Sequence, residues 1–252
     1  MRLAPGPCAR LLVCVAAMTS ACGARAGRTD AWPTVAVERR EVSLPSGRVV
    51  FDLYRPNGTG PHPLVIVAHG FWRSRGNMAG WGRHLAGQGF LTVVPGLPAW
   101  ADHERNGRAV SELIGALIAT PPVPIDQARI GVIGFSAGGL STLLAAANDD
   151  RIKVWVGLDP VDRDSKGAQA APRVKASAVI LRAGPSRCNA NGNASGIERG
   201  FAGRATVIVV AGATHTDPEW PTDWKARLAC GDDDEGRRAT FVEAATAALK
   251  KM

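Results

Sequence analysis

The sequence has no block of five or more like charges, although its 30 Lys and Arg residues outnumber its 22 Asp and Glu residues and the formal net charge is +8. A nucleic-acid-binding protein usually gathers its basic residues on one face or along one helix. In this chain the arginines are scattered among alanines and glycines from end to end. We therefore interpret the charge as a solvated basic surface and expect no nucleic-acid partner.

Internal repeats and long low-complexity segments are also absent from the sequence. The chain has 252 residues, of which 46% are hydrophobic. This length is enough for one α/β domain with a buried central sheet, and this composition excludes a disordered protein.

The N-terminal segment has the pattern of an export signal. A basic start is followed by a short apolar run, Leu11 to Ala17, which is too short to cross a bilayer as a helix. Small residues then lead to Cys22, as in the lipobox of bacterial lipoproteins, where a lipid on the cysteine anchors the protein to a membrane surface. Thr19 stands where leucine is commonest in that motif, so simple secretion with cleavage near Cys22 is the alternative.

These features divide the chain into three expected parts. Residues 1–22 are expected to be a signal peptide, residues 23–34 a tether, and residues 35–252 one α/β domain. The expected location is the cell envelope, with the protein held by its lipid anchor, or otherwise the periplasm or the medium.

Cysteine is scarce, and its distribution supports export. Cys8 and Cys14 would leave with the leader and Cys22 would carry lipid, so Cys188 and Cys230 remain. An even pair in an oxidising compartment favours a disulfide, with two unpaired buried thiols as the alternative. Neither of these two has a second Cys or a His at ligand spacing, so we expect no metal site and no cofactor.

Strand-like and helix-like stretches alternate through most of the chain, which predicts a doubly wound, mostly parallel sheet. Two N-terminal stretches around a Pro-Ser-Gly turn predict an antiparallel hairpin at the edge of this sheet. The polar segments 99–106 and 186–196 follow strands, so we expect them as loops at the carboxyl edge, where ligands bind. The expected strands are 35–44, 48–54, 63–68, 90–94, 129–133, 154–158, 178–183 and 206–210, and the expected helices are 78–88, 109–118, 137–147 and 236–251.

Residues 134–138 read Gly-Phe-Ser-Ala-Gly and fit the pattern G-x-S-x-G. A buried strand precedes the motif and a helix rich in small residues follows it, which is the context of a nucleophile elbow. The glycines leave room for a sharp turn that exposes a serine hydroxyl at the edge of the sheet. The motif therefore predicts Ser136 as a nucleophile, and the alternative is a chance glycine-rich turn.

The general base is predicted from chain order, which on such a sheet is Ser, acid, His. The strand 206–210 is expected to be the last strand of the core, and His215 follows it and is the histidine in the right place. His62 is expected in a turn. His84 is expected either at the surface or in the core with its hydrogen bonds made. His103 is expected in a loop that lines the substrate pocket.

The acid is harder to place, because many α/β-hydrolases carry it after the strand that corresponds here to 178–183. The loop from 184 to 196 contains no Asp or Glu. Asp159 follows directly on the preceding strand and can accept a hydrogen bond from the imidazole. We therefore predict Asp159 as the acid, with Asp162 and Asp164 as fallbacks and a simple strand-end turn as the alternative.

An oxyanion hole needs two backbone N–H groups near the nucleophile. One is expected from Ala137, the residue after the serine, and the other from Phe71, with Trp72 second, in the loop after the strand 63–68. His69 is expected to shape that loop. The side chains of Phe71, Trp72 and Trp100 would give the pocket an apolar wall, with ordinary packing as the alternative.

The order HGF, GFSAGG, LDPVD, PSRCN and GATH resembles the chlorophyllase branch of the α/β-hydrolases from about Val35 to the C-terminus. The resemblance implies the α/β-hydrolase fold, and it implies Asp159 as the acid, because that branch uses the Asp of its D-P-V motif. Residues 69–139 are also similar to bacterial polyester hydrolases and dienelactone hydrolase relatives. The chlorophyllase elbow commonly has Arg where this chain has Ala137, which argues against chlorophyll as the natural substrate.

These features predict an exported serine hydrolase that cleaves small-molecule or lipid-like carboxylic esters through an acyl-enzyme. A polyester depolymerase or lipase that acts on larger esters is the second interpretation. A catalytically silent binding protein on a hydrolase scaffold is the alternative from another class, because a fold alone does not establish an activity.

Overall fold

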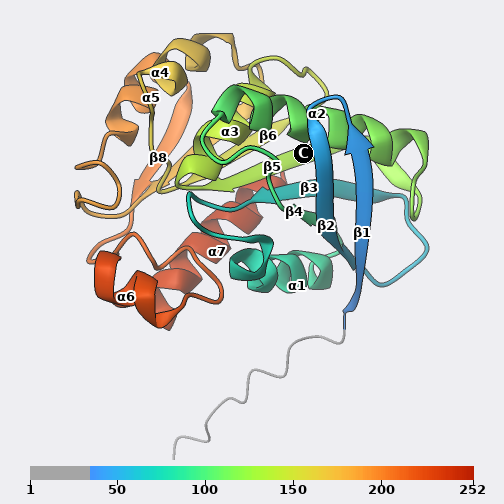
Figure 1. Cartoon of the computed structure of the whole chain (residues 1–252), viewed down its shortest axis with the longest axis horizontal. Helices are drawn as coiled ribbons and strands as arrows, with labels where there is room; N and C mark the ends of the chain where they lie inside the picture. The colour runs from blue at the N-terminus through green and yellow to red at the C-terminus, as the bar shows by residue number, and fades with distance from the viewer. Residues whose placement is uncertain (1–34) are drawn as a thin grey trace, which may run out of the picture. The chain divides into compact units, whose positions relative to one another are not determined.

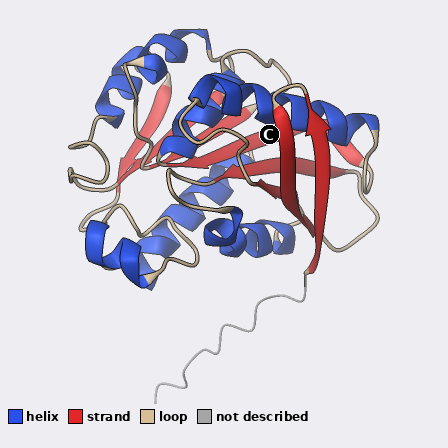
Figure 2. Ribbon diagram, in the orientation of Figure 1, coloured by secondary structure: helices blue, strands red, loops and turns tan. Residues whose placement is uncertain are grey.

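The computed structural model describes residues 35–252, which form one sheet of eight strands with helices on both of its faces (Figures 1 and 2). The predicted signal peptide, tether and lipidation of Cys22 lie outside the described residues. No helix among residues 35–252 is long and apolar enough to cross a membrane.

The strand order of the sheet is β1-β2-β4-β3-β5-β6-β7-β8. β1 pairs antiparallel with β2 and β2 antiparallel with β4, whereas all other neighbours are parallel. The predicted α/β-hydrolase fold with an antiparallel N-terminal edge hairpin is confirmed. The strands are β1 Ala36–Leu44, β2 Gly47–Arg55, β3 His62–Ala68, β4 Leu91–Pro95, β5 Ile125–Phe135, β6 Val154–Leu158, β7 Ser177–Arg182 and β8 Ala205–Val209.

The helices divide between the two faces of the sheet (Figure 1). α2 and α3 pack into one hydrophobic core, and α1 and α7 pack into the other. The α-helices are α1 Ala79–Gly87, α2 His103–Ala119, α3 Ala137–Ala146, α4 Lys166–Ala170, α5 Ala194–Gly200, α6 Trp224–Cys230 and α7 Glu235–Leu249, with short 3-10 helices at Arg75–Met78 and Ala171–Arg173.

β3 is a continuous apolar run because helices cover both faces of this central strand. Leu64 and Ile66 point into the core under α2 and α3, while Val65 and Val67 point into the core under α1 and α7. All four side chains are fully buried. Successive residues of a strand face opposite sides, so a strand covered by helices on both sides must be apolar throughout.

Two expectations about the elements were wrong. β8 was expected as a core strand, but it pairs only with β7 at the edge of the sheet, and Val209 is 63% exposed. The segment 99–106 was expected as a loop throughout, but α2 already begins at His103, because the carboxylate of Asp102 accepts a hydrogen bond from Arg105 N–H and caps the helix.

Three short helices were not predicted. α4, α5 and α6 have 5, 7 and 7 residues, too few to show a helical period in the sequence. α5 begins at Ala194, so the end of the expected loop 186–196 is also helical.

Candidate active site

Ser136 lies at the sharp turn between β5 and α3, where φ is +53° and ψ is −121°. A positive φ is uncommon for a residue with a side chain, and it is maintained here by close packing of the turn. A side chain at Gly134 would collide with the carbonyl oxygen of Gly138, and one at Gly138 would collide with that of His69. The glycines of the motif are therefore required by the close approach of backbone segments.

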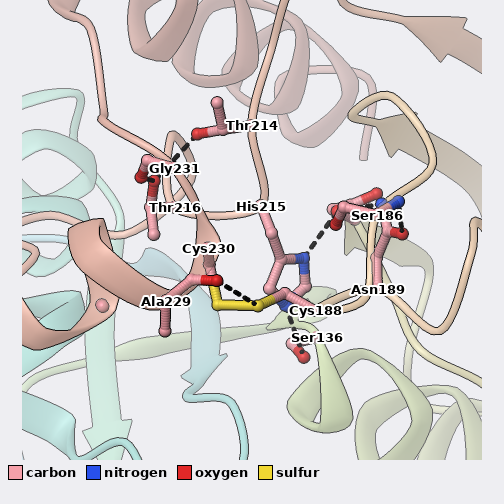
Figure 3. Close-up of a disulfide and its surroundings, with 12 residues drawn as sticks. Ser136, Ser186, Cys188, Asn189, Thr214, His215, Thr216, Ala229, Cys230 and Gly231 are labelled. Carbon is pink, nitrogen blue, oxygen red and sulfur yellow. Dashed lines mark hydrogen bonds and ion pairs between the residues drawn. A yellow bond between two sulfur atoms is a disulfide. The ribbon is translucent and has the colours of Figure 1, made fainter.

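His215 lies between Ser136 and Asp159. Its Nε2 is 3.0 Å from Ser136 Oγ, and its Nδ1 is 2.6 Å from Asp159 Oδ2. Figure 3 shows the imidazole directed at Ser136. With Nδ1–H donating to the carboxylate, Nε2 is left to accept the serine proton. The structure thus brings together the three residues that chain order singled out.

Asp159 is almost completely buried and follows directly on β6. Its Oδ1 accepts a hydrogen bond from Ala183 N–H at 3.0 Å, and its Oδ2 accepts a second from Asn189 Nδ2 at 3.0 Å, in addition to the one from His215. The carboxylate is therefore held by donors from two strand ends. Sequence reasoning missed Asn189.

The two fallback acids lie elsewhere. The carboxylate of Asp162 accepts hydrogen bonds from Gly167 N–H and Ala168 N–H at the beginning of α4. Asp164 is exposed and pairs with Arg163. Neither has a hydrogen bond with His215 among the described residues, so Asp159 is the one carboxylate of the three that reaches the imidazole.

The turn that carries His215 is held by a second buried carboxylate, Asp217. Its Oδ2 accepts hydrogen bonds from Thr214 N–H and Arg237 Nε, both at 2.7 Å, and its Oδ1 accepts one from Asp234 N–H at 2.7 Å. These contacts join the turn to the beginning of α7. Asp217 was also missed, although it lies only two residues after His215.

The loop after β3 passes close to Ser136. A side chain at Gly70 would lie 3.1 Å from Ser136 Cβ. His69 shapes this loop as expected, because its Nδ1 lies 2.9 Å from Gly70 O and its Nε2 accepts from Leu97 N–H at 3.3 Å. Burial lowers the pKa of His69 and so favours the neutral ring. A neutral ring has one nitrogen that donates and one that accepts, as these two contacts require.

A buried ion pair fixes the same loop to the segment after His215. Arg73 donates to Glu219 Oε2 at 2.7 Å, and Thr222 Oγ donates to the same oxygen at 2.7 Å. Glu219 is almost fully buried, and a carboxylate in such a place needs partners within the protein, which Arg73 and Thr222 provide. The loop predicted to supply an oxyanion donor and the turn predicted to supply the base are thereby joined.

A cleft of about 380 Å³, within the range of small-molecule sites, is lined by Ala137 and Gly138, the two residues that follow Ser136. Phe71 and Ala137 both line it, which places the two predicted oxyanion donors on the same cavity. Trp72 and Trp100 lie at its rim, and the ring centroids of Phe71, Trp72 and Trp100 are 4.9–6.1 Å apart. A larger hollow of about 560 Å³ between α2, α3 and α4 has mostly charged and polar walls and contains none of the residues described above.

His103 lines the cleft, as expected, but it stands at the first position of α2 and not in a loop. Its Nδ1 is 3.4 Å from Ser141 Oγ, and burial lowers its pKa. His84 lies in α1, and its Nε2 lies 3.0 Å from Thr246 Oγ1. The ring therefore has a hydrogen-bond partner where it packs. His62 was expected in a turn but is the first residue of β3.

Cys188 and Cys230 form a disulfide, as predicted (Figure 3). The bridge joins the loop after β7 to the end of α6. The next residue, Gly231, accepts a hydrogen bond from Thr216 Oγ1, beside His215. The disulfide therefore connects the loop that carries Asn189 with a segment that supports the base.

Replacing both Cys188 and Cys230 with serine should lower the free energy of unfolding by roughly 3–4 kcal/mol in the chain-entropy model. The reason is that the bridge closes a long loop, with a sequence separation of 42. The melting temperature should fall by on the order of 10 °C, as measured by circular dichroism. Reductant should shift the wild-type protein and leave the double variant unchanged. Equal melting temperatures for oxidised and reduced wild-type protein would contradict the prediction.

The sheet order, the elbow at Ser136 and the contacts of His215 define an α/β-hydrolase. Residues 24–184 match the sequence model of the family described as PET hydrolase-like, and because this match covers more than half of the chain, the protein belongs to that family. The match ends at the start of the loop after β7, before Cys188 and Asn189.

Curated relatives agree with this family. The chain is 29% identical over 136 residues to a bis(hydroxyethyl) terephthalate hydrolase of Streptomyces coelicolor, which covers 52% of this chain and 43% of that protein. It is 25% identical over 113 residues to cutinase 1 of Thermobifida cellulosilytica, which covers 43% of each chain. The chain thus spans less than half the length of these relatives.

Solved structures show the same fold. A dienelactone hydrolase from Anabaena variabilis has a TM-score of 0.69 at 18% identity, covering 87% of this chain and 99% of that one. A dienelactone hydrolase-like promiscuous phosphotriesterase from metagenomic libraries has a TM-score of 0.69 at 18% identity, covering 86% of this chain and 98% of that one. The predicted similarity to polyester hydrolase and dienelactone hydrolase relatives is confirmed, while the closer likeness to chlorophyllases stays a prediction.

Proposed function

We propose that this protein is a serine hydrolase that cleaves carboxylic esters through an acyl-enzyme. The observation that carries the proposal is the pair of hydrogen bonds that His215 makes, with Ser136 Oγ through Nε2 and with Asp159 Oδ2 through Nδ1. An imidazole in this position can take the serine proton while a buried carboxylate stabilises the resulting cation.

The reaction follows from these contacts. Ser136 Oγ attacks the ester carbonyl carbon as His215 Nε2 takes its proton, and the tetrahedral oxyanion is stabilised by the N–H groups of Ala137 and Phe71. Collapse of this intermediate breaks the bond to the alcohol oxygen, which receives the proton from His215. Water, deprotonated by His215, then attacks the acyl carbonyl carbon. The bond to Ser136 Oγ breaks, the proton passes from His215 back to that oxygen, and the carboxylic acid is released. Asp159 orients the imidazole in both halves of the reaction and stabilises the imidazolium that forms.

An aromatic or extended apolar ester is the substrate class that the cleft favours. Phe71, Trp72 and Trp100 stack against one another and remain 40%, 76% and 67% exposed at the rim. Exposed aromatic rings beside a reactive serine provide a flat surface on which an aromatic acyl or alcohol group can lie. The open rim also supports the second candidate, a polyester depolymerase, and relatives named as a terephthalate ester hydrolase and a cutinase are consistent with either.

Export is part of the proposal. The disulfide between Cys188 and Cys230 supports it, because disulfides persist mainly in oxidising compartments. Lipid anchoring through Cys22 rests on the sequence motif alone.

A fluorophosphonate probe tests the serine mechanism directly. Wild-type protein should gain the mass of one probe, and peptide mapping should locate it on Ser136. A panel of p-nitrophenyl esters of increasing acyl length would then define the preferred group. A catalytically silent binding protein would show neither labelling nor turnover.

Replacing Trp100 with alanine should raise KM for aromatic esters about 3- to 10-fold, because an aromatic contact contributes about 0.5–1.5 kcal/mol beyond its buried area. The value of kcat, and the kinetics for a short acetate ester, should change little. Trp224→Ala is the matched control, since Trp224 is also 67% exposed but does not line the cleft. Equal effects of the two substitutions would show that the rim does not bind the substrate.

A further inference from the structure

The side-chain amide of Asn189 is buried and makes four hydrogen bonds, as many as an amide group can make. Its Nδ2 donates to Asp159 Oδ2 at 3.0 Å and to Gly184 O at 2.8 Å. Its Oδ1 accepts from Ser186 N–H at 2.8 Å and from Gly192 N–H at 2.9 Å. The two backbone N–H groups require an acceptor, so the orientation of the amide is fixed with its donor toward Asp159.

The position of Asn189 explains how it reaches the carboxylate. β6 and β7 are parallel neighbours, so the residues that follow them meet at one edge of the sheet. Asp159 follows β6 and Asn189 lies in the loop after β7, beside His215 (Figure 3). This loop, where many α/β-hydrolases carry the acid itself, has no carboxylate here and supplies an amide donor to the acid instead.

We propose that Asn189 is a positioning residue of the triad. Its amide donates to the same oxygen of Asp159 that accepts from His215 and fixes the carboxylate in line with the imidazole. A hydrogen bond to a charged acceptor in a buried site is among the stronger ones, because little solvent screens it. The inference rests on the proposed function, since it assigns a role in the same triad.

The loop has a separate anchor, which allows positioning to be distinguished from mere loop folding. Asn193 Nδ2 donates to Asp162 O at 2.6 Å, and Asn193 Oδ1 accepts from Asp162 N–H at 2.9 Å. Asn193 thus fastens the same loop to the segment after β6, and within residues 35–252 it makes no hydrogen bond to Asp159. Loss of the Asn193 side chain tests whether the activity depends on the anchoring of the loop. Loss of the Asn189 donor tests whether it depends on the orientation of the Asp159 carboxylate.

The decisive variant is Asn189→Asp, which keeps the size of the side chain and the acceptor for Ser186 and Gly192 N–H. The amide donor that serves both Asp159 and Gly184 O is replaced by an oxygen. A second carboxylate then lies about 3 Å from Asp159, where two like charges do not both stay ionised at neutral pH. The shared proton would deprive His215 of its full counter-charge. Of the other charged groups around this loop, Arg182 pairs with Glu198, Asp162 accepts hydrogen bonds from the first turn of α4, and Arg187 is exposed on the loop itself.

We expect Asn189→Asp to lower kcat about 30- to 100-fold at pH 7 with KM nearly unchanged, and to recover activity as the pH rises and the pair ionises. The low-field proton resonance of the His215–Asp159 hydrogen bond should shift in Asn189→Asp. Asn193→Ala should keep kcat within about 3-fold and keep that resonance, even where its melting temperature falls. If Asn189→Asp does not fold, Asn189→Ala measured against Asn193→Ala tests the same point.

A wild-type kcat and pH profile in Asn189→Asp would overturn the proposal, as would equal losses in the Asn189 and Asn193 variants. If the wild-type protein neither labels nor turns over any ester, the proposed function has failed. The proton resonance still reports in that case whether Asn189 positions Asp159.

Discussion

Replacing Ser136 with alanine should lower the rate of ester hydrolysis by about 10³-fold or more. The acyl-enzyme cannot form without the hydroxyl that lies 3.0 Å from His215 Nε2. His215→Ala should lose a similar amount, because the residues of a triad act as a unit and removal of one disables the others. The measurement is kcat of the purified variants, with circular dichroism to confirm that each is folded.

His84→Ala is the control for loss of a histidine, since His84 packs in α1 against Thr246 and lies outside the triad. It should keep the activity. Retention of a near-wild-type rate by Ser136→Ala, in protein free of contaminating esterase, would end the serine mechanism.

Replacing Asp159 with asparagine should lower turnover by about 10⁴-fold, as the same change does in a comparable triad. The carboxylate accepts from three donors, on Ala183, Asn189 and His215. An amide at this position brings its own donor group against one of these three and removes the charge that stabilises the imidazolium. The imidazole would then be held in the wrong tautomer, which kcat against a good p-nitrophenyl ester would reveal.

Asp162→Asn and Asp164→Asn are the matched controls, and both should lose far less activity. Asp162 caps α4, so its loss should appear in the melting temperature and not in kcat. If Asp162→Asn proves severe while Asp159→Asn stays active, the acid has been assigned to the wrong residue. If none of the three matters, the acid comes from another part of the chain.

Much of the fold could be predicted because the central strands are apolar throughout. β6 was predicted at its observed bounds, Val154–Leu158, because it is buried on both faces. β8 has a similar composition, and only its place in the strand order makes it an exposed edge, which no local pattern reveals. The early beginning of α2 was readable from Asp102, a favoured capping residue, but the polar residues after it obscured the helical period.

Some residues of the candidate site could also be predicted from the sequence, and others could not. Ser136 and His215 were found because the elbow motif and the chain order of the triad are local or ordinal signals. Asn189 contacts Asp159, 30 positions away, and Glu219 contacts Arg73, 146 positions away. No short sequence motif predicts such distant pairs. Asp217 lies close to His215 in the sequence, but two of its three partners lie 17 and 20 positions further on, so its role became visible only in the folded chain.

α6 contributes no buried residue, although it stands next to the segment that supports the base. A helix of this kind belongs to the least protected part of a protein and opens in fluctuations far smaller than global unfolding. The turn with His215 also has an attachment that bypasses α6, because Asp217 fastens that turn to the beginning of α7 directly. The outer surface of α6 is therefore a place where the sequence can vary, or a new surface can be engineered, while the geometry of the base is preserved.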